Sequence, residues 1–172
     1  MKQILIAIAC SDQKVSAQLA HMLCELTKYG IDRNVNIQSV FFPDDAMFCM
    51  SKNEVFNLAH CKKHDAVLFM PSDIQCCESV ILDVLLSDDD AIAIQSDQND
   101  TMSMNFLKLS EKVVNDLWES NVEVNYRETK VKNICEHSFS NGIYLDEGTV
   151  LYNKIIELGY QVRVNVDMSS NE

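Results

Sequence analysis

The chain has 172 residues, of which 47% are hydrophobic, and it contains only 4 glycines and 2 prolines. This composition is typical of a globular protein and argues against a disordered or fibrous chain. The formal net charge is −12, and no run of basic residues is longer than Lys62-Lys63, so we expect no direct binding of nucleic acid or of an anionic membrane. No segment reaches the roughly 20 apolar residues of a membrane span, and we expect no membrane insertion.

The cysteines predict free thiols and not a disulfide scaffold. There are 7 of them, an odd number, and Cys10, Cys24 and Cys49 lie within apolar patterns in which a thiol packs as a small hydrophobic group. The first apolar run, residues 4–10, is too short for the core of a signal peptide. We therefore expect a soluble protein of a reducing compartment, the cytoplasm.

The first half of the chain alternates between strand and helix patterns. A continuous apolar run predicts a buried strand over residues 4–9, and the Ser11-Asp12 loop after it is a possible N-cap. Apolar residues at helical spacing then predict a helix that Gly30 closes. Ser51 and Glu54 have the spacing of a capping box at the start of a later helix. The further elements are a strand over 35–42, a helix over 51–61, a strand over 66–70 and a short helix over 79–86.

The second half continues this alternation. A strand over 91–94 follows the turn at residues 88–90, and residues 105–117 form a helix or a strand that leads into one. Residues 121–143 are polar and poorly patterned. The last elements are a helix over 146–158, closed by Gly159, and a strand over 161–166. No repeat or linker divides the chain, so we expect one compact domain over residues 1–172.

Strands that alternate with helices predict an α/β fold with a mostly parallel central sheet flanked by helices. We expect the strands over 4–9, 67–70 and 91–94 to be neighbours in this sheet. In such sheets, ligands bind beyond the carboxyl ends of the strands. The polar segments expected at that edge are Ser11-Asp12, 43–45, 71–73 and 88–97.

Three blocks of sequence share a pattern with a known family. They are ILIAIACSD (residues 4–12), SKNEVFNLAHCKKHDAVLFMPSDIQCCESVILDVLLSDDDAIA (51–93) and LDEGTVLYNKIIELGYQVRVNVD (145–167). In this order they resemble three parts of the small phage and bacterial glycosyltransferases of family-2 type. These parts are the first strand with its nucleotide-contacting loop, the strand that ends in Asp-x-Asp, and a late helix that opens with Glu-Asp. The resemblance implies the GT-A fold, that of nucleotide-diphospho-sugar transferases.

The resemblance also implies a donor site. Asp73 falls on the metal-binding Asp of the Asp-x-Asp motif, and Pro71 stands where the first Asp is usual. A lone carboxylate is expected to hold Mn²⁺ or Mg²⁺ weakly and together with the nucleotide, because these ions take several oxygen ligands. The other donor-binding residues that the resemblance implies are Cys10, Ser11, Asp12, Lys52 (in place of the usual Arg) and Asn53.

Asp146 and Glu147 are the catalytic residues that the resemblance implies. Glu147 aligns with the Glu of the Glu-Asp pair and Gly148 with the Asp, the expected base, although a shift of one residue would place an acid there. The predicted function is the transfer of a sugar from a nucleotide-diphosphate sugar to an unidentified acceptor. Because Pro71 and Gly148 replace two carboxylates, the alternative is a catalytically inactive GT-A-like module for binding or assembly.

Several of these residues also have a purely structural interpretation. Asp73 is a natural N-cap for the helix that follows it, and Glu147 suits the first turn of a helix through the helix dipole. The donor-site hypothesis instead predicts Asp73 at the mouth of the principal pocket, near Asn53 and the Ser11-Asp12 loop. Asp88-Asp89-Asp90 is more simply a solvated turn than a metal cluster. A zinc site is not expected at His60, Cys61, His64, Cys76 and Cys77, because their spacing is unsuitable.

Overall fold

The structure of the chain, a computed structural model, describes residues 1–10, 14–43, 48–74, 76–94, 106–126, 128–140 and 142–165. The elements are β1 (Lys2–Cys10), α1 (Ala17–Asp32), β2 (Val35–Pro43), α2 (Phe48–Lys62), β3 (Ala66–Pro71), α3 (Glu78–Leu86), β4 (Ala91–Ile94), β5 (Leu107–Ser110), α4 (Glu111–Ser120), β6 (Glu123–Tyr126), β7 (Thr129–Lys132), β8 (Ser138–Ser140), β9 (Ile143–Leu145), α5 (Glu147–Glu157) and β10 (Val162–Asn165). Within these ranges, no helix has both the length and the apolar character needed to cross a membrane.

Six strands form the central sheet in the order β10-β4-β5-β3-β1-β2. β1 pairs in parallel with β2 and β3, and β10 pairs in parallel with β4, whereas β5 is antiparallel to both β3 and β4. All of these strands except β5 therefore run in one direction, and the predicted mostly parallel α/β sheet is confirmed. The prediction that the strand over 91–94 lies beside the strand over 67–70 is wrong, because β5 separates them.

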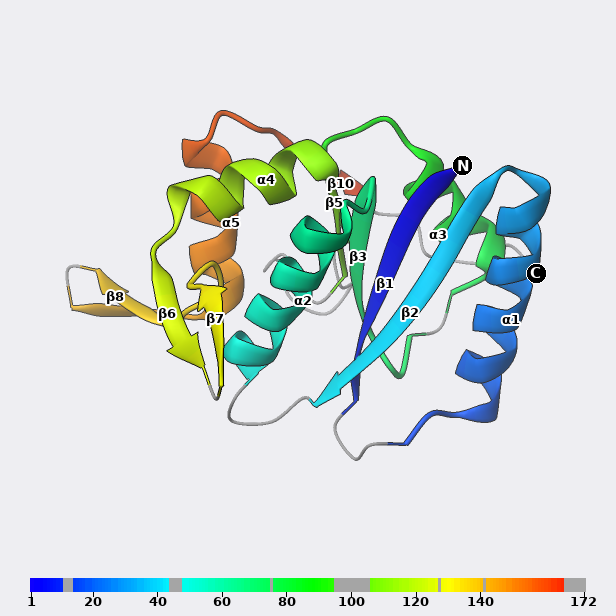
Figure 1. Cartoon of the computed structure of the whole chain (residues 1–172), viewed down its shortest axis with the longest axis horizontal. Helices are drawn as coiled ribbons and strands as arrows, with labels where there is room; N and C mark the ends of the chain where they lie inside the picture. Colours follow the sequence, from blue (N-terminus) through cyan, green and yellow to red (C-terminus); the bar gives the residue numbers. More distant parts are fainter. Residues whose placement is uncertain are drawn as a thin grey trace.

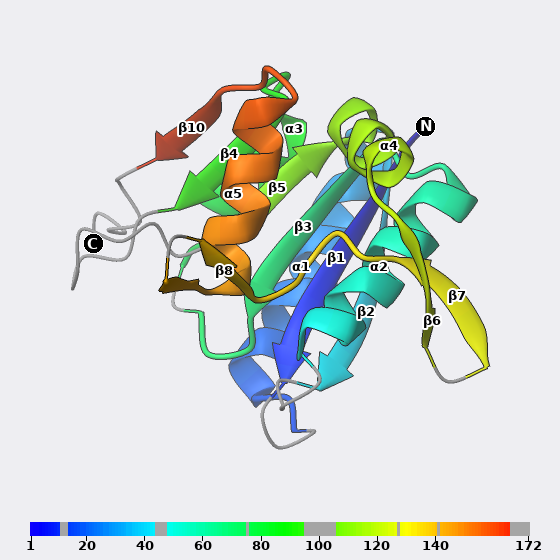
Figure 2. The same cartoon turned by 90° about the vertical axis from the view of Figure 1, so that its left-hand side faces the viewer.

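Helices cover both faces of the sheet. Figure 1 shows α1 and α3 on one side and α2, α4 and α5 on the other, and Figure 2 shows the second group in front of the strands. The alternation of side chains along β1 explains the two layers. Ile4, Ile6 and Ile8 pack toward α1 and α3, whereas Leu5 and Ala7 belong to the core under α2, α4 and α5.

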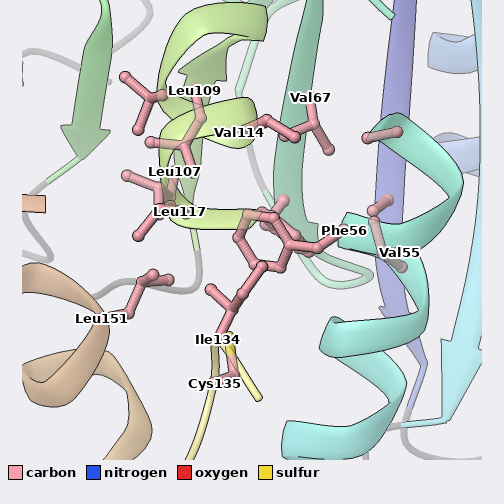
Figure 3. Packing of buried hydrophobic residues seen from close by; sticks show 14 of the residues in the cluster. Val55, Phe56, Val67, Leu107, Leu109, Val114, Leu117, Ile134, Cys135 and Leu151 are labelled. Atoms are coloured by element: carbon pink, nitrogen blue, oxygen red, sulfur yellow. The ribbon is translucent and has the colours of Figure 1, made fainter. Parts of the chain in front are cut away.

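The core under α2, α4 and α5 fixes the positions of these three helices against the sheet. Phe56 of α2 is fully buried and its ring centroid lies 5.1 Å from that of Phe69 on β3. Figure 3 shows Ile134 and Cys135 entering the same core from below. The chain between β7 and β8 is therefore anchored at the centre of the molecule.

The ends of the first two helices differ from the sequence prediction. Gly30 lies inside α1, which continues to Asp32, and the chain turns at Asn34 with φ 59°. A Cβ at Gly30 would meet both the Ile37 side chain and the Val35 carbonyl oxygen at 3.1 Å, so this glycine allows α1 to pack closely on β2. The capping box is also wrong, because α2 already includes Phe48 and places Ser51 in its interior.

Two small hairpins occupy the segment that was poorly patterned in the sequence. β6 pairs with β7 and β8 pairs with β9, both antiparallel. In Figure 1, β8 extends away from the body of the molecule at the end where α5 lies. Residues 105–117 follow the second of the two predicted alternatives, since β5 leads directly into α4.

Candidate functional site

The starts of α2 and α5 meet at the carboxyl edge of the sheet. α2 follows the carboxyl end of β2, and α5 leads to the amino end of β10, so both helices begin at this edge. Parallel α/β sheets bind ligands there. The side chains that the two helix starts and the β8–β9 hairpin bring together form the carboxyl-edge cluster, which consists of Cys49, Lys52, His137, Tyr144 and Glu147.

Glu147 is the centre of the carboxyl-edge cluster. Its Oε1 lies 3.8 Å from Nζ of Lys52, and its Oε2 lies 3.7 Å from Nδ1 of His137. The Lys52 side chain is 3% exposed and the Glu147 side chain is 18% exposed, whereas His137 is 50% exposed. The cluster therefore opens to solvent on the His137 side. Both ion-pair distances exceed hydrogen-bond length, so neither pair holds the carboxylate tightly.

Tyr144 and Cys49 complete the cluster. The Tyr144 hydroxyl lies 2.7 Å from Nδ1 of His137, and the two rings stack with centroids 5.6 Å apart. Cys49 lies in the first described turn of α2 and is partly buried. Burial raises the pKa of the Cys49 thiol, and the nearby Glu147 carboxylate raises it further. One ligand atom from each of Cys49, His137 and Glu147 lies within 4.8 Å of the other two.

Asn53 positions the segment that carries His137. Its side chain is fully buried, its Oδ1 accepts hydrogen bonds from the backbone N–H groups of Ile134 (3.1 Å) and Cys135 (2.7 Å), and its Nδ2 donates to the Cys135 carbonyl at 3.0 Å. Buried backbone groups need such partners. Asn53, one of the predicted donor-binding residues, thus supports the site from beneath.

Lys154 of α5 holds the same segment from the other side. Its ammonium donates to the Asn133 and Ile134 carbonyls at 3.0 and 2.9 Å, and to Oε1 of Glu136 at 2.9 Å. Two helices therefore clamp residues 133–136 from opposite sides, one through an amide and the other through an ammonium. This clamp determines where His137 lies relative to α5.

The two predicted catalytic carboxylates have different surroundings. Asp146 is the N-cap of α5, and its Oδ1 accepts a hydrogen bond from the Thr149 backbone N–H at 2.7 Å. Glu147, one residue later, turns toward Lys52 and His137. Between the two, Glu147 is the carboxylate that the structure places in the carboxyl-edge cluster.

Asp73 lies in the turn after β3, at the carboxyl edge, and its side chain is exposed. It does not cap the helix that follows, because the N-cap of α3 is Cys77. Among the described residues, the only group of three metal-ligating side chains is Cys49, His137 and Glu147, and Asp73 is not part of it. A divalent cation at Asp73 would therefore need most of its oxygen ligands from a bound nucleotide.

Of the remaining predicted donor residues, only Cys10 is among the described residues. It is the last residue of β1 and is 4% exposed. Ser11 and Asp12 lie outside the described residues, and so do residues 44 and 45. The predicted proximity of the Ser11-Asp12 loop to Asp73 therefore stays a prediction.

The acidic turn at residues 88–90 is at the opposite edge of the sheet. It precedes β4 and so lies at the amino edge, which corrects the prediction that it would join the ligand edge. The Ser110 hydroxyl donates to Oδ1 of Asp90 at 2.7 Å, and the Ser87 hydroxyl and Arg163 donate to Oδ2 of Asp89 at 2.7 and 2.8 Å. The hydrogen bonds from Ser87 and Arg163 lower the pKa of Asp89, as expected of a structural turn.

A pocket formed by described residues also lies at the amino edge. It has a volume of about 730 Å³ and is lined by residues 88–90, Lys112, Asp116 and residues 158–163. Asp73 does not line it. The Tyr160 hydroxyl donates to Asp116 within this wall, and burial together with this bond raises the pKa of Tyr160. Asp89, Asp116, Tyr160 and Arg163 of its wall are already paired with one another, and we assign no site to the pocket.

His60 and Cys61 at the end of α2, and His64 just after it, lie apart from the carboxyl-edge cluster. His60 stacks on Trp118 with ring centroids 4.6 Å apart and lies 2.8 Å from Oδ1 of Asn115. His64 is buried and its Nε2 lies 3.3 Å from Gln38. Cys61 is exposed. The structure does not gather them with Cys76 and Cys77 into a group of metal ligands.

Sequence analysis did not identify His137, Tyr144 or Cys49 as site residues. The first two lie in the poorly patterned segment, and only the Asn141-Gly142 dipeptide gave a local signal there, since Asn-Gly favours a two-residue hairpin turn. Gly142 has φ 79°, and Ser140 pairs with Ile143 across that turn. The hairpin places Tyr144 against His137. Nothing local in the sequence indicates the contact of either with α2.

Comparisons with known proteins give information on the fold alone. No family model matches the chain, and no curated protein matches it. Among solved structures, it is similar to the crystal structure of a glycosyltransferase involved in the glycosylation of the major capsid of PBCV-1. The TM-score is 0.52 and the sequence identity 10%, and the match covers 95% of this chain and 81% of that chain. The chain therefore has a glycosyltransferase-like α/β fold.

Proposed function

We propose that this protein is a glycosyltransferase that moves a sugar from a nucleotide-diphosphate sugar to an acceptor hydroxyl at the carboxyl edge of the sheet. The observation that carries the proposal is the position of Glu147, a largely buried carboxylate at a helix start on the ligand edge of a glycosyltransferase-like fold. The sequence resemblance to GT-A enzymes, in which a late acidic residue is the base, agrees with this assignment when the alignment is shifted by one residue, because the unshifted alignment places Gly148 at the base.

In this reaction Glu147 accepts the proton of the acceptor hydroxyl. As the acceptor oxygen bonds to the anomeric carbon, the bond from that carbon to the diphosphate oxygen breaks, and the nucleoside diphosphate leaves with the bonding electrons. A positioned carboxylate contributes typically 10²–10⁴-fold to such a step. Lys52 lies 3.8 Å from one oxygen of this carboxylate, and the other oxygen faces His137 on the open side of the cluster.

The donor is expected to lie across the ends of β1 and β3. The predicted donor residues Cys10, Ser11 and Asp12 follow β1, and Asp73 follows β3, the adjacent strand. Mn²⁺ or Mg²⁺ bound by Asp73 and the donor would compensate the diphosphate charge. Lys52 supplies a cation near the same edge, and Asn53 supports the site from within the core.

One observation favours a second function, a GT-A-like module that binds without catalysis. Pro71 is the last residue of β3 and stands where the resemblance expects a carboxylate. Proline offers neither a carboxylate nor a backbone N–H to a donor. In that case the protein would bind a nucleotide-sugar and release no nucleoside diphosphate.

The experiment uses Glu147→Gln with Asp146→Asn as its matched control. Release of nucleoside diphosphate is measured with UDP-, GDP- and dTDP-hexoses in the presence of Mn²⁺ and of free monosaccharides, whose hydroxyls accept the transferred sugar. We expect release by the wild type, loss of at least about 100-fold in Glu147→Gln, and retained turnover in Asp146→Asn at a lower melting temperature. Donor-induced stabilisation without release by the wild type would select the binding module. Equal turnover in Glu147→Gln would refute the role of Glu147.

A further inference from the structure

We propose that Cys49, His137 and Glu147 form a binding site for a zinc-type transition-metal ion. The three side chains come from three separate segments: the start of α2, the chain between β7 and β8, and the first turn of α5. One thiol sulfur, one imidazole nitrogen and one carboxylate oxygen lie within 4.8 Å of one another. The three side chains thus supply three different types of metal ligand at one place.

The distances suit a tetrahedral ion after small side-chain movements. Zinc bonds to sulfur, nitrogen and oxygen at about 2.0–2.3 Å, which places neighbouring ligand atoms about 3.5 Å apart. The largest separation here is within 4.8 Å, so the ligand atoms need to approach one another by little more than about 1 Å. Three protein ligands leave a fourth position, and His137 is the exposed member through which an ion can enter.

The ligand types select the class of metal. Thiolate and imidazole favour zinc and similar ions, whereas Mg²⁺ and Mn²⁺ prefer oxygen ligands. This site is therefore chemically different from the cation predicted at Asp73. The thiolate and carboxylate together carry two negative charges, and the Lys52 ammonium beside the carboxylate offsets one of them. Binding of the ion displaces the proton of the Cys49 thiol.

The surroundings hold the ligands in the arrangement that the proposal needs. Lys52 faces Oε1 of Glu147, which leaves Oε2 turned toward His137. The Tyr144 hydroxyl lies 2.7 Å from Nδ1 of His137 and the two rings stack, so this contact orients the ring for ligation through Nε2, whereas ligation through Nδ1 requires the hydroxyl to move away. Partners of this kind orient metal ligands and typically change affinity 10–100-fold. The Asn53 clamp fixes the chain two residues before His137.

The site shares Glu147 with the proposed base, so an ion bound there takes up the carboxylate that transfer needs. We therefore expect zinc to inhibit turnover. The metal site does not rest on the transferase proposal, because binding can be measured without any sugar donor, and failure of one leaves the other intact.

The test is a titration of the reduced, full-length protein with Co²⁺, a spectroscopic substitute for Zn²⁺. We expect a thiolate-to-cobalt charge-transfer absorption at one equivalent, which Zn²⁺ abolishes by displacement. Cys49→Ser should remove this absorption, and His137→Ala and Glu147→Gln should each weaken binding at least about tenfold. Cys61→Ser is the matched control, because Cys61 is an exposed thiol on the same helix.

Two outcomes of the Co²⁺ titration would overturn the metal site. Absence of a charge-transfer band in the wild type would overturn the site. A band that survives in Cys49→Ser and disappears in Cys61→Ser would place the metal on α2 outside the cluster and would also overturn it. Circular dichroism of each variant verifies that it is folded, so that loss of the band reports loss of a ligand.

Discussion

The two edges of the sheet each contain a buried lysine near carboxylates, but the two ammonium groups have different partners. At the amino edge, Lys108 is 3% exposed and donates to the backbone carbonyls of Ser87 and Asp89. At the carboxyl edge, Lys52 is 2% exposed and faces the Glu147 carboxylate at 3.8 Å. The amino-edge groups are joined by short hydrogen bonds, whereas the ion pairs of Glu147 are long.

This difference separates a structural cluster from a candidate site. Bonds of 2.7–2.8 Å fix Asp89 and Asp90 in the turn that starts β4, and an additional ligand would have to replace them. Glu147 is held more loosely and lies beside a partly exposed histidine, so a ligand can contact it without breaking the fold. The wide pocket and residues 88–90 thus lie at the edge where Asp89 and Asp90 are already hydrogen-bonded.

The largest expected loss of stability is at the support of the carboxyl edge. Asn53→Ala removes the partners of two backbone N–H groups and one carbonyl in the core. Leaving buried polar groups unsatisfied costs about 1–3 kcal/mol each, and we expect about 3 kcal/mol in total after relaxation. Urea unfolding measures this value. Asn57→Ala, one turn later on α2, is the control with an expected loss below about 0.5 kcal/mol; equal losses would refute the clamp.

The next largest expected loss of stability follows from replacing Lys108 at the amino edge. Lys108→Met keeps an unbranched apolar chain up to the ε position but removes the ammonium that donates to two carbonyls, and we expect a loss of about 1–2 kcal/mol. The loss is moderated because burial lowers the pKa of Lys108, which means that the folded state disfavours its charge. Wild-type stability relative to Lys108→Met should therefore rise as the pH increases through the lowered pKa. A falling difference in alkaline urea titrations would contradict this sign.

A smaller effect distinguishes the two adjacent carboxylates of α5. Asp146→Ala removes the N-cap and should cost about 1 kcal/mol of stability. Glu147→Ala removes only long ion pairs and should cost less, while it alone abolishes turnover in the proposed reaction. Melting temperatures of the two variants test the first statement. A larger loss of stability in Glu147→Ala would show that its ion pairs are structural.

The smallest effect is at the exposed pair of the amino edge. Arg163→Ala should lower stability by less than about 1 kcal/mol, because Arg163 is largely exposed and solvent weakens its ion pair with the partly exposed Asp89. Ser87 and Arg163 hold the pKa of Asp89 below its ordinary value. The contribution is therefore present at neutral pH and is lost as the pH falls and Asp89 takes up a proton. A difference between wild type and variant that grows toward acid pH would contradict this account.

The fold was largely predictable from the sequence because the buried strands are continuous apolar runs. β1, β3 and β4 lie where their patterns placed them. β5 was harder to predict, since four residues of strand run directly into α4 and no turn residue separates them. Its position between β3 and β4 depends on pairing across the sheet, which periodicity along the chain does not encode.

The candidate site was only partly predictable. Lys52 and Glu147 were indicated by the resemblance, and each lies near the start of its helix. His137 and Cys49 were not indicated, because their proximity depends on the buried amide of Asn53 and the ammonium of Lys154, which hold the chain between β7 and β8. Asp88-Asp89-Asp90 was expected at the carboxyl edge. This prediction is wrong because the acidic run precedes β4 and therefore lies at the amino edge.

The most direct test of the central claim, that the carboxyl edge binds the ligand, is amide chemical-shift mapping of the ¹⁵N-labelled protein with a nucleotide-sugar and Mg²⁺, the diamagnetic member of the two predicted ions. The donor is the one identified by the release or stabilisation screen. The account predicts shifts around Cys10, Lys52, Asp73 and Glu147, at the ends of β1 and β3 and the starts of α2 and α5. Shifts confined to residues 88–90, 112–116 and 158–163 would instead place the ligand in the amino-edge pocket and contradict the account.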